Sequence, residues 1–390
     1  MWDQKVRPSH LYIHWPFCKN KCHYCDFLSF AKCDNFQKQY HDALINEISS
    51  FSKSLDPNLS RKISTIFFGG GTPSRYPLPL LEELFKNLNN HFDLSEAKEI
   101  TIEANPGGVT EGHLRTWRKV GINRLSIGVQ VLDDEALRRV NRHQTTQNFL
   151  DLMVIVPKFF ENISVDLILG LPGVEEETWL STLQKVISLP IQHISVYLLT
   201  LYDETILHQK VKDGEIEILE EDDLAAIYEK TVLYLMDQGF GQYEISNFAK
   251  KGLASEHNKA YWDCKPYRSF GLGASSFDGK RRFVNIKNLK KYIDLHCCKD
   301  GNVSMDSQYS FVEELSDEQR FLEEIMLGLR QTKGMDLHRV LYFLNGEKRE
   351  EFIKRLKKLK KEGFIREEGG RIALTLKGMI MENEVILNLF

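Results

Sequence analysis

Short runs of apolar and β-branched residues recur along the first half of the chain and predict β-strands. Six such runs lie at residues 11–15, 63–70, 99–105, 124–130, 163–170 and 193–200. Between them, longer segments repeat apolar residues at the spacing of one helix face, at residues 36–51, 78–92, 110–121, 145–160 and 175–189. Strands that alternate with helices favour a parallel sheet built from right-handed βαβ units.

Polar or glycine residues stand near the ends of most of these strands. A cysteine-rich loop follows the first strand and "GGGTP" follows the second, while the next three carry Glu103 with Asn105, Gln130 and Asp166. In parallel α/β folds, ligand sites gather at the carboxyl ends of the strands. The pattern therefore predicts a barrel-like sheet, complete or partial, with its site at that edge.

The pattern changes after the predicted barrel. A βα-like region at residues 227–249 and the glycine-rich "FGLGASSFDGK" extend it to about residue 285. We predict a polar linker over residues 286–314, then a domain over residues 315–390 with helices and a hairpin that turns at "EEGG", which resembles a winged helix. Its basic run, "KRLKKLKKEG", fits a solvated helix face better than a DNA-binding surface.

Composition and charge narrow the function classes. The 390 residues carry a net charge of -4, so no global basic field points to nucleic acid or to an anionic membrane. The first residues are polar and lack a signal-peptide apolar region, and no window is long and apolar enough for a membrane span. We therefore expect a cytoplasmic protein, in which clustered cysteines indicate metal binding rather than disulfides.

The loop "CKNKCHYC" holds Cys18, Cys22 and Cys25 in a C-x3-C-x2-C spacing. Three thiols on one loop can converge on zinc or on an iron–sulfur cluster. A structural zinc ion would need a fourth ligand, for which His23 and Cys33 are candidates. Three thiolates around a four-iron cluster instead leave one iron open to a small molecule.

This spacing, with an aromatic residue directly before the last cysteine, resembles the radical S-adenosylmethionine (radical SAM) enzymes. "YIHWPFC", "FFGGGTPS", "IEANP", "SIGVQ", "VNRHQ" and "DLILGLPG" follow in an order similar to the oxygen-independent coproporphyrinogen III oxidase branch. The resemblance implies a partial TIM-like (β/α)6 barrel with a small C-terminal winged-helix-like domain. It also implies a [4Fe–4S] cluster on Cys18, Cys22 and Cys25, whose open iron binds SAM.

Carried over residue by residue, the resemblance implies that the SAM site is lined by Tyr12, Tyr24, Gly70, Gly71, Thr72, Glu103, Gln130, Arg142 and Asp166. These residue types suit the task. Glycines let the backbone approach a ligand closely, and carboxylates and amides accept hydrogen bonds from an amine or from ribose hydroxyls. An arginine guanidinium can donate two parallel hydrogen bonds to a carboxylate. Each of them taken alone fits a structural role equally well: a tight turn, a satisfied polar group at a strand end, or aromatic packing.

Two features separate the oxidases of this branch from haem chaperones of the HemW type. The oxidases have a fourth cysteine where this chain has Phe27, and a longer extension before the motif, whereas here 17 residues precede Cys18. In addition, "HNKAYW" at residues 257–262 resembles a motif of the chaperones, which implies that haem is bound by His257, Asn258, Tyr261 and Trp262. A neutral imidazole is a good axial ligand. On the hexapeptide alone, an ordinary surface or hydrogen-bonded histidine is the better interpretation of His257, and Cys264 could be an alternative iron ligand, although a buried thiol is more common.

The resemblance thus implies a chaperone that passes haem to an acceptor haemoprotein, which could lie in a membrane. It also implies that an electron donor reduces the cluster. A second hypothesis is a radical enzyme that decarboxylates coproporphyrinogen III, with Tyr12, His14 and Glu103 near its substrate. A third, a zinc-bearing DNA-binding regulator, rests only on the cysteine loop and the C-terminal helices. We do not expect nucleic acid as a partner.

Overall fold

A curved sheet of twelve strands forms the body of the protein, whose computed structural model describes residues 2–297 and 308–390. Six parallel strands lie at its centre: β1 (His10–Trp15), β4 (Thr65–Gly70), β5 (Glu99–Ala104), β6 (Arg124–Gln130), β7 (Asn162–Leu169) and β8 (His193–Leu198). They coincide with the six apolar runs of the sequence, which confirms the predicted strands. Most of their residues are buried, as in sheets covered on both faces.

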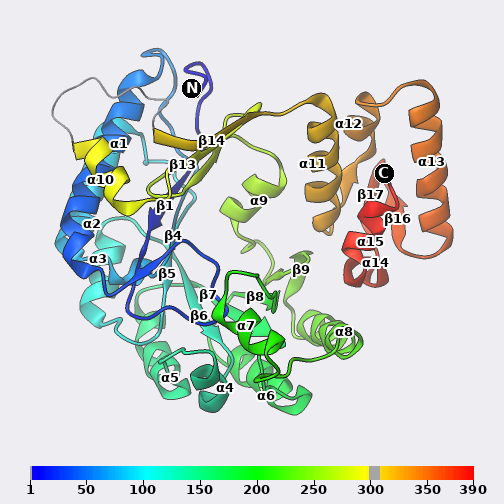
Figure 1. Ribbon diagram of the computed structural model, residues 1–390, viewed down its shortest axis with the longest axis horizontal. Helices are drawn as coiled ribbons and strands as arrows, with labels where there is room; N and C mark the ends of the chain where they lie inside the picture. The colour runs from blue at the N-terminus through cyan, green and yellow to red at the C-terminus, as the bar shows by residue number, and fades with distance from the viewer. Residues whose placement is uncertain (1, 298–307) are drawn as a thin grey trace.

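Helices cover the outer face of these strands (Figure 1). They are α1 (Gln37–Ser54), α2 (Leu78–His91), α3 (Glu111–Lys119), α4 (Asp134–Arg139), α5 (Thr146–Ile155) and α6 (Glu176–Ile187). All but α4 were predicted from apolar periodicity. Side-chain hydrogen bonds cap the first turns of several helices. Thr145 forms a capping box at the start of α5, and the Asp133 carboxylate accepts from two backbone N–H groups at the start of α4.

Shorter elements complete this half of the chain. They are the strands β2 (Phe17–Cys18) and β3 (Phe30–Ala31), the 3-10 helices η1 (Asp34–Phe36), η2 (Pro73–Arg75) and η3 (Val156–Lys158), and α7 (Ile206–Lys212). The pair β2 and β3 brackets the cysteine loop and joins its two ends in parallel register.

Antiparallel strands extend the sheet at both edges. Beside β1 lie β11 (Tyr267–Phe270), which is parallel to β1, and then β12 (Ser275–Phe277), β13 (Arg281–Asn285) and β14 (Tyr309–Glu314). Beside β8 lie β10 (Asn247–Ala249) and β9 (Gly241–Glu244), which follow α8 (Glu221–Asp237). The region 227–249, expected to be βα-like, is thus a helix and an antiparallel pair. The strand order β14-β13-β12-β11-β1-β4-β5-β6-β7-β8-β10-β9 is linear, so the barrel is partial.

One short helix, α9 (Glu256–Trp262), lies inside the curve of the sheet (Figure 1). Glu99, at the start of β5, holds the first turn of α9 in place. The Glu99 carboxylate accepts from the Ser255 hydroxyl at 2.9 Å and from the Glu256 N–H at 2.7 Å. Thr65, at the start of β4, hydrogen-bonds to His257 at 2.7 Å. The amino ends of the strands therefore fix α9, and the opposite, carboxyl ends are left for the cysteine loop.

The segment 286–314, expected to be a linker, contains regular structure on both sides of residues 298–307, which lie outside the described part. It carries α10 (Leu289–Cys297), which packs on α1, and β14, which pairs with β13. The physical reason is a fully buried ion pair, Arg268 with Glu47 at 3.0 Å, whose carboxylate also accepts from the Tyr292 hydroxyl of α10 at 2.7 Å. A buried ion pair is stable only when all its hydrogen-bond partners are in place, so the Tyr292 hydroxyl holds this segment to the barrel.

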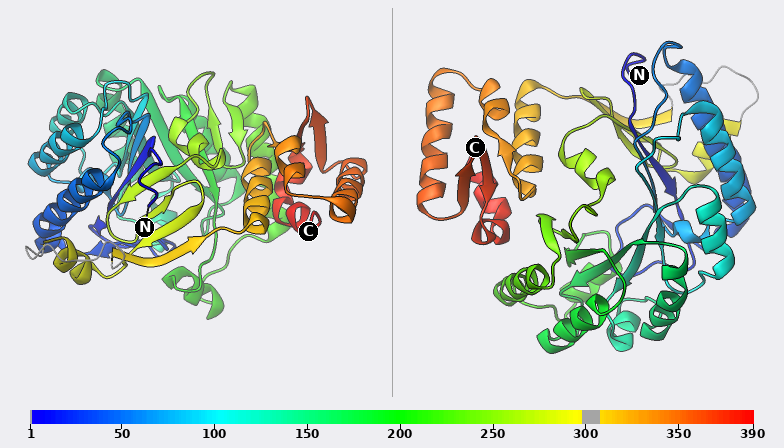
Figure 2. Two further views of the ribbon diagram at one scale, coloured as in Figure 1. Left: turned by 90° about the horizontal axis from the view of Figure 1, so that it is seen from above. Right: turned by 180° about the vertical axis from the view of Figure 1, so that it is seen from behind.

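The C-terminal domain contains α11 (Asp317–Arg330), α12 (Leu337–Tyr342), α13 (Gly346–Lys361), α14 (Leu376–Ile380), α15 (Glu382–Leu387) and the strands β15 (Met335–Asp336), β16 (Ile365–Glu368) and β17 (Arg371–Leu374). Both views in Figure 2 place it beyond α9, away from the parallel strands. The predicted hairpin turns at Gly369 and Gly370, whose φ values of 55° and 77° suit glycine. On α13, Leu356 and Leu359 face the core while the lysines are exposed. None of the described helices is long and apolar enough to cross a bilayer.

Candidate functional site

The cysteine loop lies over the carboxyl ends of the parallel strands and is tied down by backbone contacts. The His23 N–H donates to the Val140 carbonyl at 2.9 Å, and the His23 carbonyl accepts from the Leu207 N–H at 2.9 Å. The Asn141 side chain donates to the Lys21 carbonyl at 2.9 Å. The loop that presents the three thiols is therefore braced by the turn after α4 and by the start of α7.

The three thiols share one environment. Cys18 is 8% exposed, Cys22 and Cys25 are half-buried, and all three are free of disulfides. Burial raises the pKa of the Cys18 thiol and raises that of Cys25 to about 11. The Cys18 and Cys25 thiols are therefore protonated until a metal centre displaces the protons, as is usual for thiolate ligands.

Glycines after β4 reserve space beside these thiols. A Cβ on Gly71 would come within 3.0 Å of the Cys18 sulfur and within 2.9 Å of the Pro16 backbone. Gly70 has a φ of 114°, and a Cβ there would lie 2.7 Å from the His14 ring. This cradle, together with a donor set of three thiols, fits a four-iron cluster with room for a ligand next to it.

A zinc site would require three or four ligands around one point. Within residues 2–297 and 308–390, no group of three or more His, Cys, Asp or Glu side chains is arranged to hold a single metal ion. His23 and Cys33, the candidate fourth ligands, therefore form no such group with the loop cysteines in this part of the chain. The thiolates of a cluster lie farther apart than the ligands of one ion.

A polar network joins the cysteine loop to the strand ends through Arg142. Its guanidinium donates to the Tyr24 hydroxyl at 3.1 Å, to the Asn105 side-chain oxygen at 2.9 Å and to the Cys22 sulfur at 3.7 Å. Asn105 in turn donates to the Thr72 hydroxyl at 3.4 Å, and Thr72 donates to the Cys18 sulfur at 3.4 Å. Tyr24, Thr72 and Arg142, which the resemblance assigned to one site, are thus joined in one network, and the bridging role of Asn105 was not predicted.

Gln130 reaches the same network because β6 ends in a bulge. The pairing of β6 with β7 shifts between Gly128 and Gln130, and Gln130 has a φ of 71°. A Cβ on Gly128 would lie 3.0 Å from the Gln130 amide nitrogen and 2.9 Å from Arg142. The bulge therefore turns the Gln130 side chain beside the guanidinium.

Glu103 and Asp166 form a second polar group inside the barrel. Asp166 accepts from the Ser126 hydroxyl at 2.9 Å and from the Ser195 hydroxyl at 2.7 Å. Burial, reinforced by the nearby Asp166 carboxylate, raises the pKa of Glu103 to about 8. At neutral pH the pair therefore holds a proton on Glu103, and the carboxyl group can donate as well as accept.

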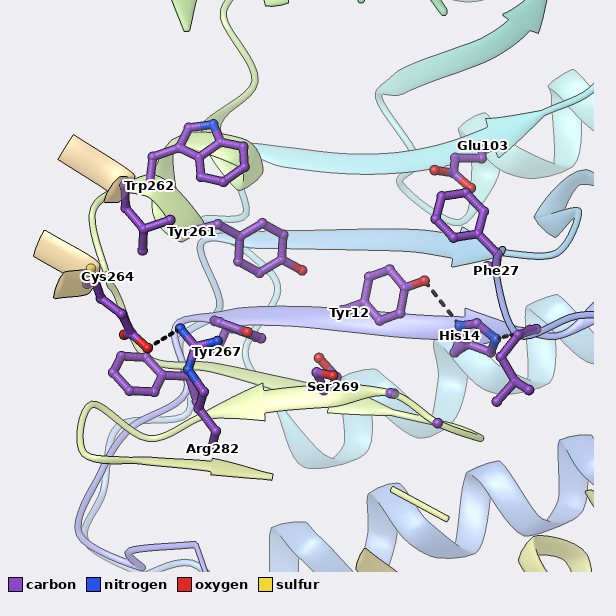
Figure 3. A pocket seen from close by; sticks show the side chains of 18 residues that line it. Tyr12, His14, Phe27, Glu103, Tyr261, Trp262, Cys264, Tyr267, Ser269 and Arg282 are labelled. Atoms are coloured by element: carbon purple, nitrogen blue, oxygen red, sulfur yellow. Dashed lines mark hydrogen bonds and ion pairs between the residues drawn. The ribbon is translucent and has the colours of Figure 1, made fainter. Parts of the chain in front are cut away.

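A cavity of about 550 Å³ runs along the inner face of β1, β4 and β5 (Figure 3). At the carboxyl ends of the strands it is lined by Phe27, Glu103 and His14; at the other end it is lined by Trp262, Cys264 and Arg282, next to α11. In its middle, Tyr261 points from α9 toward Tyr12 of β1. The volume is that of a site for a small molecule or cofactor.

Neutral groups and unsatisfied donors line this cavity. The Tyr12 hydroxyl lies 3.2 Å from His14 Nδ1, and His14 Nε2 donates to the Leu28 carbonyl at 2.9 Å, which leaves Nδ1 as an acceptor. Burial lowers the pKa of His14 to about 4, so the ring is neutral. In the described part of the chain, Ser269 Oγ, Trp262 Nε1 and Arg282 Nε are buried without a hydrogen-bond partner. Such groups are rare, and their gathering in one cavity indicates a polar ligand.

His257, expected to be the axial haem ligand, does not line this cavity. It lies in the first turn of α9 and is fully buried. Its two ring nitrogens lie 2.7 Å from the Thr65 hydroxyl and 2.9 Å from the Tyr261 hydroxyl. Burial lowers its pKa to about 3. The structure therefore differs from the expectation: Tyr261 and Trp262 reach the cavity, His257 supports them, and Asn258 is a half-buried residue on the same helix.

Comparisons with known proteins agree with this fold. The family model described as Radical SAM superfamily matches residues 12–186, and that of the HemN C-terminal domain matches residues 315–381. A solved structure, coproporphyrinogen III oxidase (HemN) from Escherichia coli, covers 99% of this chain and 90% of its own with a TM-score of 0.82 and 24% identity. That likeness shows a shared fold.

Curated relatives match over almost their full length. The haem chaperone HemW of Bacillus subtilis is 34% identical over 377 residues, which are 96% of this chain and 97% of that protein. The haem chaperone HemW of Lactococcus lactis is 30% identical over 380 residues, 97% of this chain and 96% of that protein. This chain therefore belongs to the radical SAM superfamily, as a member of the HemW family.

Proposed function

We propose that this protein is a haem chaperone, which binds haem in the cavity beside a [4Fe–4S] cluster and SAM and passes it to an acceptor haemoprotein. The observation that carries the proposal is the cavity itself. It is lined by the rings of Tyr12, Tyr261, Trp262 and Tyr267, and it reaches from the cysteine loop to the C-terminal domain. Aromatic faces and a few fixed polar groups suit a planar, apolar macrocycle with carboxylate side chains.

In this proposal Cys18, Cys22 and Cys25 hold the cluster. SAM would lie over Gly70, Gly71 and Thr72, within reach of Tyr12, Tyr24, Glu103, Gln130, Arg142 and Asp166. A reduced cluster with SAM can supply one-electron chemistry, and the chain contributes placement and electrostatics. Arg142 keeps positive charge beside the Cys22 sulfur, and Glu103 keeps its proton until a cationic ligand arrives to favour the ionised form.

Tyr261 and Trp262 would face the haem, and His257 and Asn258 would hold α9 in position. Arg282 offers its guanidinium to a haem carboxylate, because it pairs with Glu323 at 2.7 Å but keeps a buried Nε without a partner in the described residues. The acceptor, which can be bound to a membrane, and an electron donor are the expected partners. We expect this work in the cytoplasm, where the thiols stay reduced.

The alternative, oxidative decarboxylation of coproporphyrinogen III, would use the same fold. Phe27 argues for the chaperone. It stands where the resemblance places the fourth cysteine of the oxidases, it is 59% exposed, and its ring lies at the cluster end of the cavity (Figure 3). An apolar ring at this position can neither ligate a metal nor transfer a proton.

Haem titration of anaerobically reconstituted protein tests the proposal. We expect about one haem per chain, and we expect Ser275→Trp to lose it, because Ser275 is an exposed residue at the cavity wall and an indole there fills the space. Ser181→Trp, on the exposed face of α6, is the matched control and should bind as the unmodified protein does. If no haem binds, or if Ser275→Trp binds it unchanged, the cavity is not the site.

A further inference from the structure

Cys264 follows α9 in a backbone conformation that usually requires glycine. Its φ is 51°. Its N–H donates to the Tyr261 carbonyl at 3.1 Å, and the N–H of Lys265 donates to the Ala260 carbonyl at 3.0 Å. These two bonds define a Schellman helix end, whose left-handed position is most often glycine. A side chain there costs about 1 kcal/mol, so the cysteine is held against a backbone preference.

With this backbone conformation, Cys264 lies at the wall of the cavity. Cys264 is half-buried and lines the end of the cavity with Trp262, Arg282 and Glu323. Burial raises the pKa of this thiol to about 12, so it is protonated in the free chain and is a poor nucleophile. A metal that replaces the proton can still bind the sulfur, because thiolate is a strong, soft ligand.

Ser269 gives an independent sign that a ligand occupies the same cavity. It is 1% exposed, its hydroxyl has no hydrogen-bond partner in the described part of the chain, and it lines the cavity wall between β1 and β12. An unsatisfied buried hydroxyl costs about 1–3 kcal/mol. A bound molecule with hydrogen-bonding groups would remove that penalty.

Both ring nitrogens of His257 are engaged, one with the Thr65 hydroxyl and the other with the Tyr261 hydroxyl, so neither is free to bind an iron in this arrangement. We infer that Cys264 supplies the axial thiolate to the iron of a haem bound in this cavity, an inference that rests on the proposed function. The S–H bond breaks, an iron–sulfur bond forms, and the proton leaves to solvent, while the iron remains ferric. Burial and the carboxylates of Glu324 and Glu323 keep the thiol protonated in the free chain, and the smaller effects of Arg339 and Arg282 oppose them, so the metal itself must displace the proton.

The test uses ferric haem added to the full chain, with absorbance and electron paramagnetic resonance as readouts. Wild-type protein should show the signature of a thiolate-ligated ferric haem. Cys264→Gly should lose this signature, and it should melt no lower than wild type, because glycine suits the positive φ. Cys33→Ser, at a half-buried cysteine that is not at the cavity, is the control and should keep the wild-type spectrum.

The outcomes separate the two proposals. If haem binds wild type and Cys264→Gly with one and the same spectrum, Cys264 is not the ligand, although the haem-binding proposal stands. If His257→Ala alone abolishes the wild-type spectrum, the ligand is His257 and α9 must rearrange. If ferric haem does not bind to wild type at all, both proposals fail.

Discussion

The proton on Glu103 makes the stability of the protein depend on pH in a defined way. Its pKa rises from 4.5 to about 8 through burial and the nearby Asp166. Between these values the folded chain keeps a proton that the unfolded chain has lost, so the free energy of unfolding falls as pH rises through about 8. One pKa unit corresponds to about 1.4 kcal/mol, so the loss between about pH 6 and about pH 9 is about 3 kcal/mol.

Glu103→Gln replaces the protonated carboxyl by an amide that does not titrate, so this loss should disappear. The assay is urea unfolding, followed by tryptophan fluorescence, of cofactor-free protein at pH values across this range. Glu161→Gln, at an exposed glutamate before β7, is the control and should retain the wild-type slope. Parallel pH profiles for wild type and Glu103→Gln would refute the conclusion that Glu103 is protonated in the folded state.

Three further predictions follow from single contacts. Glu47→Gln leaves the Arg268 charge buried without its partner and should lower the free energy of unfolding by about 3–5 kcal/mol in urea titrations. Gly71→Ala should fold but lose most of the iron–sulfur absorbance after reconstitution, because its methyl group would lie 3.0 Å from the Cys18 sulfur. His257→Gln should flatten the acid side of the stability curve: the His257 pKa is lowered from 6.5 to about 3, so its neutral ring adds stability that is lost as pH falls below about 6.5.

The first two of these variants, Glu47→Gln and Gly71→Ala, each have a matched control. Glu96→Gln breaks an exposed ion pair with Lys62 and should cost less than about 1 kcal/mol. Gly107→Ala adds a methyl group where the nearest atom lies 3.7 Å away, so cluster absorbance should not change. Equal losses in a variant and its control would mean that the contact named here is not the cause.

The sequence predicted the central sheet because each of its six parallel strands is a compact apolar run. It led us to expect the site at the carboxyl ends of the strands, because parallel strands bring those ends together. It did not predict which side chains touch. Asn105 bridges Arg142 and Thr72 only in the register that the sheet adopts, and a shift of one residue would turn each side chain to the other face.

The environment of His257 depends on contacts that are distant in sequence. Its partner Thr65 lies 192 residues away, and no local pattern reveals that bond. The six residues of the motif therefore revealed neither the helix α9 nor the burial of the ring. In the same way, the buried pair of Arg268 with Glu47, which holds segment 286–314 to the barrel, joins residues 221 apart.

The most direct test of the account is haem transfer by the intact protein. Haem-loaded protein would be mixed with a haem-free apo-haemoprotein, and the same preparation would be incubated with SAM, a reductant and coproporphyrinogen III while carbon dioxide is measured. The account predicts that the Soret band moves to the acceptor at a rate above that of free haem, and that no carbon dioxide is released. Release of carbon dioxide with consumption of SAM, and no transfer of haem, would contradict it.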